Sequence, residues 1–171
     1  MAAAQARDRG SPFAENLGFL FLRLALGTIF VAHGAQKLFG WFGGPGYTAT
    51  VQRFSTGLGI PPWLSVLVIL TEFVGGILVI LGVFTRLAAF ALAVEMLVAG
   101  ALVHARYGFF LNWENRPGVG HGVEMNLALL GMALLLLCAG PGQWALAGDT
   151  ELALTRLAFR RPRPAARART G

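Results

Sequence analysis

Four long apolar runs alternate with short polar segments along the chain. They cover residues 17–39, 63–84, 87–105 and 123–140, which makes them 23, 22, 19 and 18 residues long. A helix of about 20 apolar residues crosses the ~30 Å hydrocarbon core of a bilayer. The pattern therefore predicts an all-α integral membrane protein, a four-helix bundle of antiparallel spans.

The segments between the runs indicate how the spans are connected. In the first connection Val51, Phe54 and Leu58 recur at helical spacing, which predicts a short amphipathic helix lying at the membrane interface in the first outer loop. The second and third runs are separated by almost nothing, so they are predicted to form a tight antiparallel hairpin, with Thr85 as the N-cap of the third span.

The same pattern divides the chain into three parts. Residues 1–16 are predicted to be a disordered N-terminal arm, residues 17–148 the four-span membrane domain, and residues 149–171 a basic C-terminal tail. The first run is too long for the apolar core of a signal peptide and lacks a small-residue cleavage site, so we interpret it as a retained span.

Composition excludes a soluble globular enzyme as the default, since 56% of the residues are hydrophobic and only 13% are charged. The net charge of +6 reflects the tail, where six arginines lie in the last 16 residues. We interpret this tail as an orientation signal and a contact for anionic lipid, and we expect no nucleic-acid binding. Counting Lys and Arg outside the spans gives nine on the side of the termini and four on the other, which predicts both termini in the cytoplasm.

Three ionisable residues lie at similar depth inside the spans: Arg23, Glu72 and Glu95. Each costs about 2.5–3.5 kcal/mol at the centre of a bilayer, so such groups normally face the interior of a bundle and pair with one another. We therefore predict an intramembrane polar network of these three. A structural ion-pair network and a proton or ligand pathway both remain open.

Small residues accompany these charges. Arg23, Gly27, Gly34 and Lys37 form one stripe on the first span, and glycines follow Glu72 on the second. Small residues let membrane helices approach closely, and polar residues then bridge them. The stripe is predicted to be a helix contact.

A second group of polar residues is predicted at the outer mouth of the bundle, where antiparallel connectivity brings the span ends together. The candidates for ligand binding are His33, Lys37, His104, His121 and Glu124. Histidine titrates near neutral pH and binds metals, so a quinone site and a metal or haem site are both conceivable. No HxxxH or ExxH spacing supports a metal, and we predict none. In an alternative interpretation His33 and Glu124 hydrogen-bond across spans one and four, and no catalytic residue is identified.

The ordered succession of motifs between about residues 17 and 148 resembles the DoxX family of small four-helix bacterial membrane proteins. The motifs are Leu22-Arg23-Leu24; His33-Gly34 with Lys37-Leu38-Phe39; Gly59-Ile60-Pro61-Pro62; Glu72-Phe73-Val74-Gly75-Gly76; Leu81-Gly82-Val83-Phe84-Thr85-Arg86-Leu87-Ala88; Met96 with Ala99 and Ala101; and Gly122-Val123-Glu124.

The resemblance implies a bacterial cytoplasmic (inner) membrane protein. DoxX-like proteins are named for similarity to a subunit of a thiosulfate:quinone oxidoreductase, and some relatives associate with sulfurtransferase and superoxide-detoxifying partners. The family motif matches Arg23, His33, Lys37, Glu72, Arg86 and Glu124. A related branch with thiol-redox associations is disfavoured, because Cys138 is the only cysteine.

Three hypotheses for function follow. The first is a membrane subunit of a redox complex that binds a quinone, with soluble oxidoreductase or sulfurtransferase partners. The second is a non-catalytic scaffold or assembly factor for soluble partners, and the third is a small-solute or proton pathway. Enzymatic activity and the formation of a homo-oligomer are left open.

Overall fold

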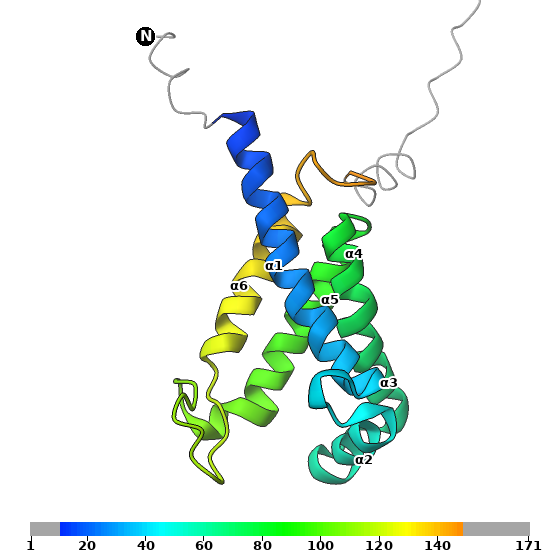
Figure 1. Ribbon diagram of the computed structural model, residues 1–171, viewed down its shortest axis with the longest axis vertical. Coiled ribbons are helices and arrows are strands. Elements are labelled where there is room, and N and C mark those ends of the chain that lie inside the picture. Colours follow the sequence, from blue (N-terminus) through cyan, green and yellow to red (C-terminus); the bar gives the residue numbers. More distant parts are fainter. Residues whose placement is uncertain (1–10, 149–171) are drawn as a thin grey trace, which may run out of the picture.

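The computed structural model describes residues 11–148, and within this range every regular element is a helix (Figure 1). The fold class predicted from the sequence, an all-helical membrane protein, is therefore confirmed. The helices are α1 (Pro12–Phe39), α2 (Gly46–Leu58), α3 (Pro62–Leu70), α4 (Gly76–Leu81), α5 (Thr85–Ala99) and α6 (Glu124–Ala139). Short π and 3₁₀ turns extend or join them, namely η1 (Trp41–Gly43), η2 (Thr71–Gly75), η3 (Gly100–His104) and η4 (Ala105–Tyr107).

The first span begins earlier than the apolar run suggests. Helix α1 starts at Pro12, where the fixed φ of proline suits the first helical position, and Glu15 lies in the first turn. The helix therefore includes residues 12–16, which the sequence analysis placed in a disordered arm. It ends at Gly40, whose φ of 74° lies in the left-handed region that favours glycine.

The second and third spans are each one continuous apolar helix with a π turn inside. Residues Pro62–Leu81 contain η2, and Thr85–Tyr107 contain η3 near their end. The predicted tight hairpin between them is present, because Gly82 ends the second span and the third begins at Thr85. Thr85 is not the N-cap: that position is Phe84, and the Thr85 hydroxyl is buried without a hydrogen-bond partner among the described residues.

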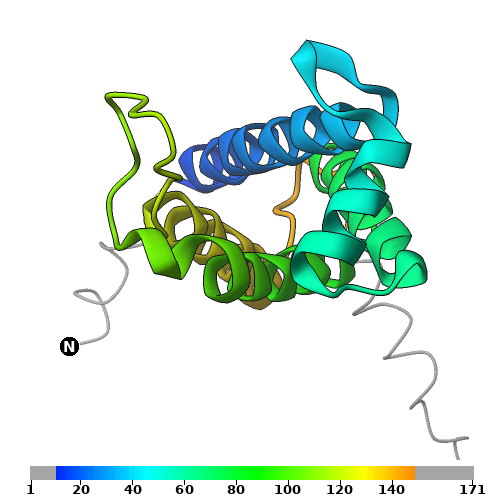
Figure 2. The same cartoon turned by 90° about the horizontal axis from the view of Figure 1, so that it is seen from below.

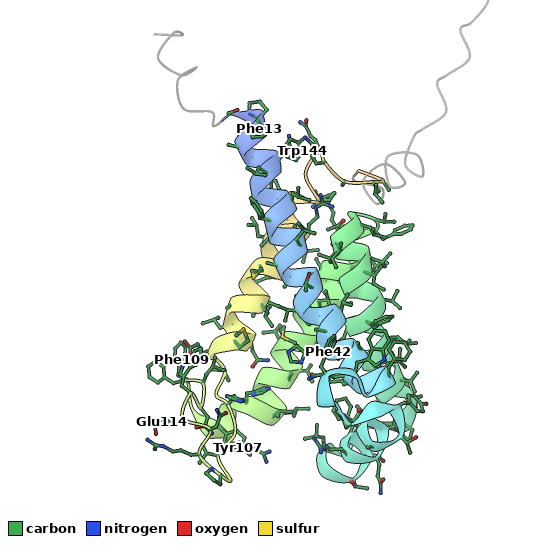
Figure 3. All side chains as sticks on the ribbon, in the orientation of Figure 1. Phe13, Phe42, Tyr107, Phe109, Glu114 and Trp144 are labelled. Carbon is green, nitrogen blue, oxygen red and sulfur yellow. The ribbon has the colours of Figure 1, made fainter. Side chains whose placement is uncertain are left out.

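Within residues 11–148, three helices are long and apolar enough to cross a membrane, those of the first three runs. The fourth, α6, has 16 residues and so extends about 24 Å at ~1.5 Å per residue. The start of α1 and the segment after α6 lie at the same end of the bundle, where the rings of Phe13 and Trp144 are 5.1 Å apart (Figure 3). An even number of crossings brings the two ends of a bundle together in this way.

Two packing interfaces organise the bundle. Helix α1 packs along η2 and α4, while α5 packs on α6, and direct packing of α1 on α6 is limited (Figure 2). The α1 interface is very close: a Cβ at Gly34 would lie 2.6 Å from the backbone nitrogen of Phe73, and a Cβ at Gly27 would lie 2.7 Å from the carbonyl oxygen of Gly76. The glycines of the predicted stripe thus meet the backbone of the second span.

This contact predicts the effect of one added methyl group. Gly34→Ala forces α1 away from η2, and we expect overpacking to cost about 1–3 kcal/mol and to lower the Tm of the detergent-purified protein. The matched control is Gly18→Ala in the same helix, where a Cβ would meet nothing within 4 Å. Equal Tm values for the two variants would contradict the close packing.

Candidate functional site

One large cavity lies in the half of the bundle nearer to α2. Its volume is about 630 Å³, within the ~300–1,000 Å³ range of sites that hold small molecules. Its walls come from α1, α2, the second span, α5 and α6, and they are mostly apolar. Polar side chains are gathered in a few places on this lining, and their positions define what the cavity can bind.

An ion pair forms the polar part of the wall between α1 and the second span. The ammonium group of Lys37 donates hydrogen bonds to both carboxylate oxygens of Glu72. The Glu72 side chain is only 5% exposed, and that of Lys37 is 22% exposed. Glu72 lies in the π turn η2, a type of irregularity that is frequent at functional sites. Burial of a carboxylate this complete requires such a partner.

Glu95 on α5 lies on the opposite side of Glu72. The carboxyl groups of Glu95 and Glu72 lie close to one another, and both residues line the cavity. The Oε2 atom of Glu95 is buried and has no hydrogen-bond partner in the part of the chain that the structure describes. This oxygen is therefore the polar atom of the cluster that remains available to a ligand.

The three histidines all line the cavity, in two places. His33 lies one helical turn before Lys37 on α1, next to the ion pair. His104, at the end of η3, donates through Nδ1 to the carbonyl oxygen of His121 at 2.8 Å, and His121 accepts from the backbone N–H of Asn112. His104 and His121 thus lie at the end of the cavity that is bordered by the long loop between η4 and α6 (residues 108–123).

Glu124 is not part of the cavity lining. Its Oε2 accepts a hydrogen bond of 3.0 Å from the backbone N–H of Leu111, and so it holds the long loop against the start of α6. The hydrogen bond to His33 that the sequence suggested is not among its contacts. Of the five residues assigned to the outer mouth, His33, Lys37, His104 and His121 are brought to one cavity, and Glu124 supports its cover.

Arg23 does not join the two glutamates. It donates through Nη1 to the carbonyl oxygen of Ile80 at 3.1 Å and through Nη2 to that of Trp144 at 2.5 Å. The side chain therefore ties α1 to the end of the second span and to the segment after α6. Arg86 acts similarly at this end of the bundle, bonding the carbonyl oxygens of Leu137 and Cys138. The predicted network of Arg23, Glu72 and Glu95 is therefore wrong for Arg23, which connects backbone segments. The residue beside Glu72 and Glu95 is Lys37.

The sequence did not indicate that some other residues contribute to the site. Phe54 and Leu58 were assigned to an interfacial helix, and α2 is indeed helical, but both residues also line the cavity. Asn112 orders the long loop through bonds to Arg116 and Val119. Within residues 11–148 no three His, Cys, Asp or Glu side chains are close enough together to hold a metal ion.

The geometry defines what the site can do chemically. An apolar ligand of moderate size fits the walls, and a polar group on it can meet Glu95, His33 and the Lys37–Glu72 pair at one place. A carboxyl group and an imidazole both line the cavity there, so the site can also donate a proton to a ligand or accept one from it.

Comparison with known proteins identifies similar chains. A family model described as DoxX matches residues 18–105. The membrane protein Rv3486 of Mycobacterium tuberculosis is 36% identical over 131 residues, which cover 73% of this chain and 76% of the relative. The inner membrane protein YqjF of Escherichia coli is 30% identical over 133 residues, covering 77% and 91%.

A third relative is CatD of Bacillus subtilis, whose name contains the word oxidoreductase. It is 32% identical over 99 residues, covering 58% of this chain and 69% of the relative. No solved structure matches the chain at a significant level.

The buried ion pair predicts non-additive mutational effects. Lys37→Met leaves the Glu72 carboxylate buried without its cation, and we expect a loss of about 3–5 kcal/mol in stability. The double variant Lys37→Met/Glu72→Met removes both charges and should recover more than half of that loss, measured by thermal unfolding in detergent.

Arg116→Ala provides the control for this cycle. It breaks an ion pair with Glu114 whose side chains are 68% and 70% exposed, and it should leave the Tm unchanged. Additive losses in the Lys37 and Glu72 variants would show that the two side chains are not paired.

Proposed function

This chain belongs to the DoxX family, and we propose that it is the membrane subunit of a quinone-linked redox complex that binds a quinone or a similar ligand in the cavity. The observation that carries the proposal is the cavity itself: about 630 Å³ of mostly apolar space with one polar cluster on its wall. A quinone has the matching form, a flat apolar ring with oxygen atoms at its edge.

The residues present fit such a ring. The carboxyl group of Glu95 has a buried oxygen without a partner, and His33 lies on the same wall. This oxygen can accept a hydrogen bond from a hydroxyl group of the reduced ring and, when it carries a proton, can donate one to an oxygen of the quinone. The ammonium of Lys37 is bonded to both oxygens of Glu72, so it holds that carboxylate in place. A bound quinone would supply the electron-accepting chemistry, and the chain's own residues would bind it, orient it and exchange protons with it.

Soluble partners complete the proposed complex. We assign the electron-donating step to an oxidoreductase or sulfurtransferase at the membrane surface, as the family resemblance implies. The word oxidoreductase in the name of CatD supports a redox role. The excess of Lys and Arg at the termini supports a placement of both termini in the cytoplasm of a bacterial inner membrane.

The two alternative hypotheses have less support from the geometry. A proton or solute pathway through Arg23, Glu72 and Glu95 needs these groups in a row, and Arg23 instead bonds the carbonyl oxygens of Ile80 and Trp144. A scaffold that only holds partners does not require a cavity. Deletion of residues 156–171 would separate the hypotheses, because scaffolding through the basic tail should fail while ligand binding survives.

Ligand binding is the direct test. We expect a short-tailed menaquinone analogue to bind the purified protein saturably, as measured by isothermal titration calorimetry. Glu95→Leu has no polar atom to meet the ring oxygen, and a lost hydrogen bond to a buried polar group costs about 1–3 kcal/mol, which is roughly a 5- to 150-fold rise in Kd.

The matched control is Glu114→Gln, which neutralises an exposed carboxylate in the long loop, outside the cavity lining. It should bind the analogue like the wild type. Absence of saturable binding to the wild type, or equal Kd values for wild type and Glu95→Leu, would refute the proposed ligand position.

A further inference from the structure

Several apolar side chains that line the cavity are about half exposed. Leu67 on α3 is 53% exposed, Val94 and Val98 on α5 are 43% and 46% exposed, and Leu102 in η3 is 52% exposed. Exposure of this size in side chains that line a cavity indicates an open stretch of its wall. These residues therefore form the edges of an opening.

The backbone explains why the opening lies between these two helices. Helix α5 packs on η2 and α4 of the second span, but it has no comparable packing against α3. From its start near α4, α5 runs away from α3 towards the end of the bundle where α2 lies (Figures 1 and 2). The gap widens in the half of the bundle that contains the cavity.

At the end of the bundle nearer to α2, the cavity is bordered by α2 and by the long loop. Phe54 and Leu58 of α2 line it there, and the long loop contributes Leu111. Backbone hydrogen bonds of 2.9–3.1 Å hold this loop against the start of α6. The N–H groups of Gly122, Val123 and Glu124 donate to the carbonyl oxygens of Phe110, Gly108 and Phe109, respectively. These bonds fix the loop at this end, whereas no comparable packing joins α3 and α5 at the side.

From these observations we infer that the ligand enters sideways from the bilayer between α3 and α5, and that the natural ligand carries a long apolar tail which stays in this opening. The inference rests on the proposed function and names its substrate class, a long-tailed lipid-soluble ring compound instead of a water-soluble one. A cavity of about 630 Å³ holds a ring and the first part of a tail. The rest of the tail then lies between Leu67 and Val98, in contact with lipid.

Two comparisons test the inference: ligands with and without a tail, and a variant whose larger side chain fills the opening. The protein is reconstituted in nanodiscs, and Kd values are measured for a radiolabelled naphthoquinone without a tail and for one with a four-unit isoprenoid tail. We expect the tailed compound to bind the wild type at least tenfold more tightly. Val98→Trp should fill the opening and weaken the tailed compound at least tenfold, while the tailless compound changes less than threefold.

Leu97→Trp is the matched control, because Leu97 is the adjacent residue of α5, is 57% exposed and does not line the cavity. It should leave both Kd values unchanged. Leu67→Trp narrows the opening from α3 and replaces Val98→Trp should that variant not fold. Equal affinity of the wild type for the two compounds, or equal weakening by Leu97→Trp and Val98→Trp, would overturn the side entrance.

The two proposals fail in different ways. Loss of binding for both compounds in the wild type would refute the quinone site, and the inference built on it. A different result would support the quinone site and refute the lateral opening. In that result the tailless compound binds tightly, the tailed compound binds equally tightly, and Val98→Trp changes neither Kd. A tailed compound with a photoreactive group on its tail gives an independent readout: labelling of α3 and α5 supports the opening, and labelling of the long loop overturns it.

Discussion

Glu72 is a carboxylate in an apolar helix, and its burial constrains the rest of the structure. A charged group in this position needs a partner of opposite charge, because neither lipid nor the neighbouring apolar side chains can solvate it. The partner is Lys37, which comes from α1. The ion pair therefore requires α1 and the second span to lie side by side, in one register, at the depth of η2.

The glycines make this register achievable. Gly27 and Gly34 precede Lys37 on the same face of α1, and both meet the second span at distances that leave no room for a side chain. Arg23 continues the same face and bonds the carbonyl oxygen of Ile80. One face of α1 thus carries two cations and two glycines, and every one of them contacts the second span. The face that α1 presents to α6 carries no comparable set of contacts.

The sequence was sufficient to predict the features that follow from periodicity and from the cost of burying charge. The four apolar runs predicted the helices, Val51, Phe54 and Leu58 predicted α2, and the stripe from Arg23 to Lys37 predicted a helix contact. The partners across that contact could not be predicted, because the distance along the chain gives depth only approximately. The sequence predicts Lys37 at the outer mouth and Arg23 with the glutamates, whereas Lys37 bonds Glu72 and Arg23 bonds backbone carbonyl oxygens. The π turns have no signature in a continuous apolar run, so the position of Glu72 on the cavity wall was not foreseeable either.

The polar residues also divide the bundle into two halves with different properties. In the half that contains the start of α1 and the end of α6, Arg23 and Arg86 donate to backbone carbonyl oxygens. These bonds connect the ends of α1, the second span, α5 and α6, which holds the helices together. In the other half, Lys37 and Glu72 hold only α1 and the second span, and α5 diverges from α3. The bundle is held together at one end and along two interfaces, α1 with the second span and α5 with α6, and it opens where none of these constraints acts. The cavity lies there, and Glu95 reaches it from the helix that diverges.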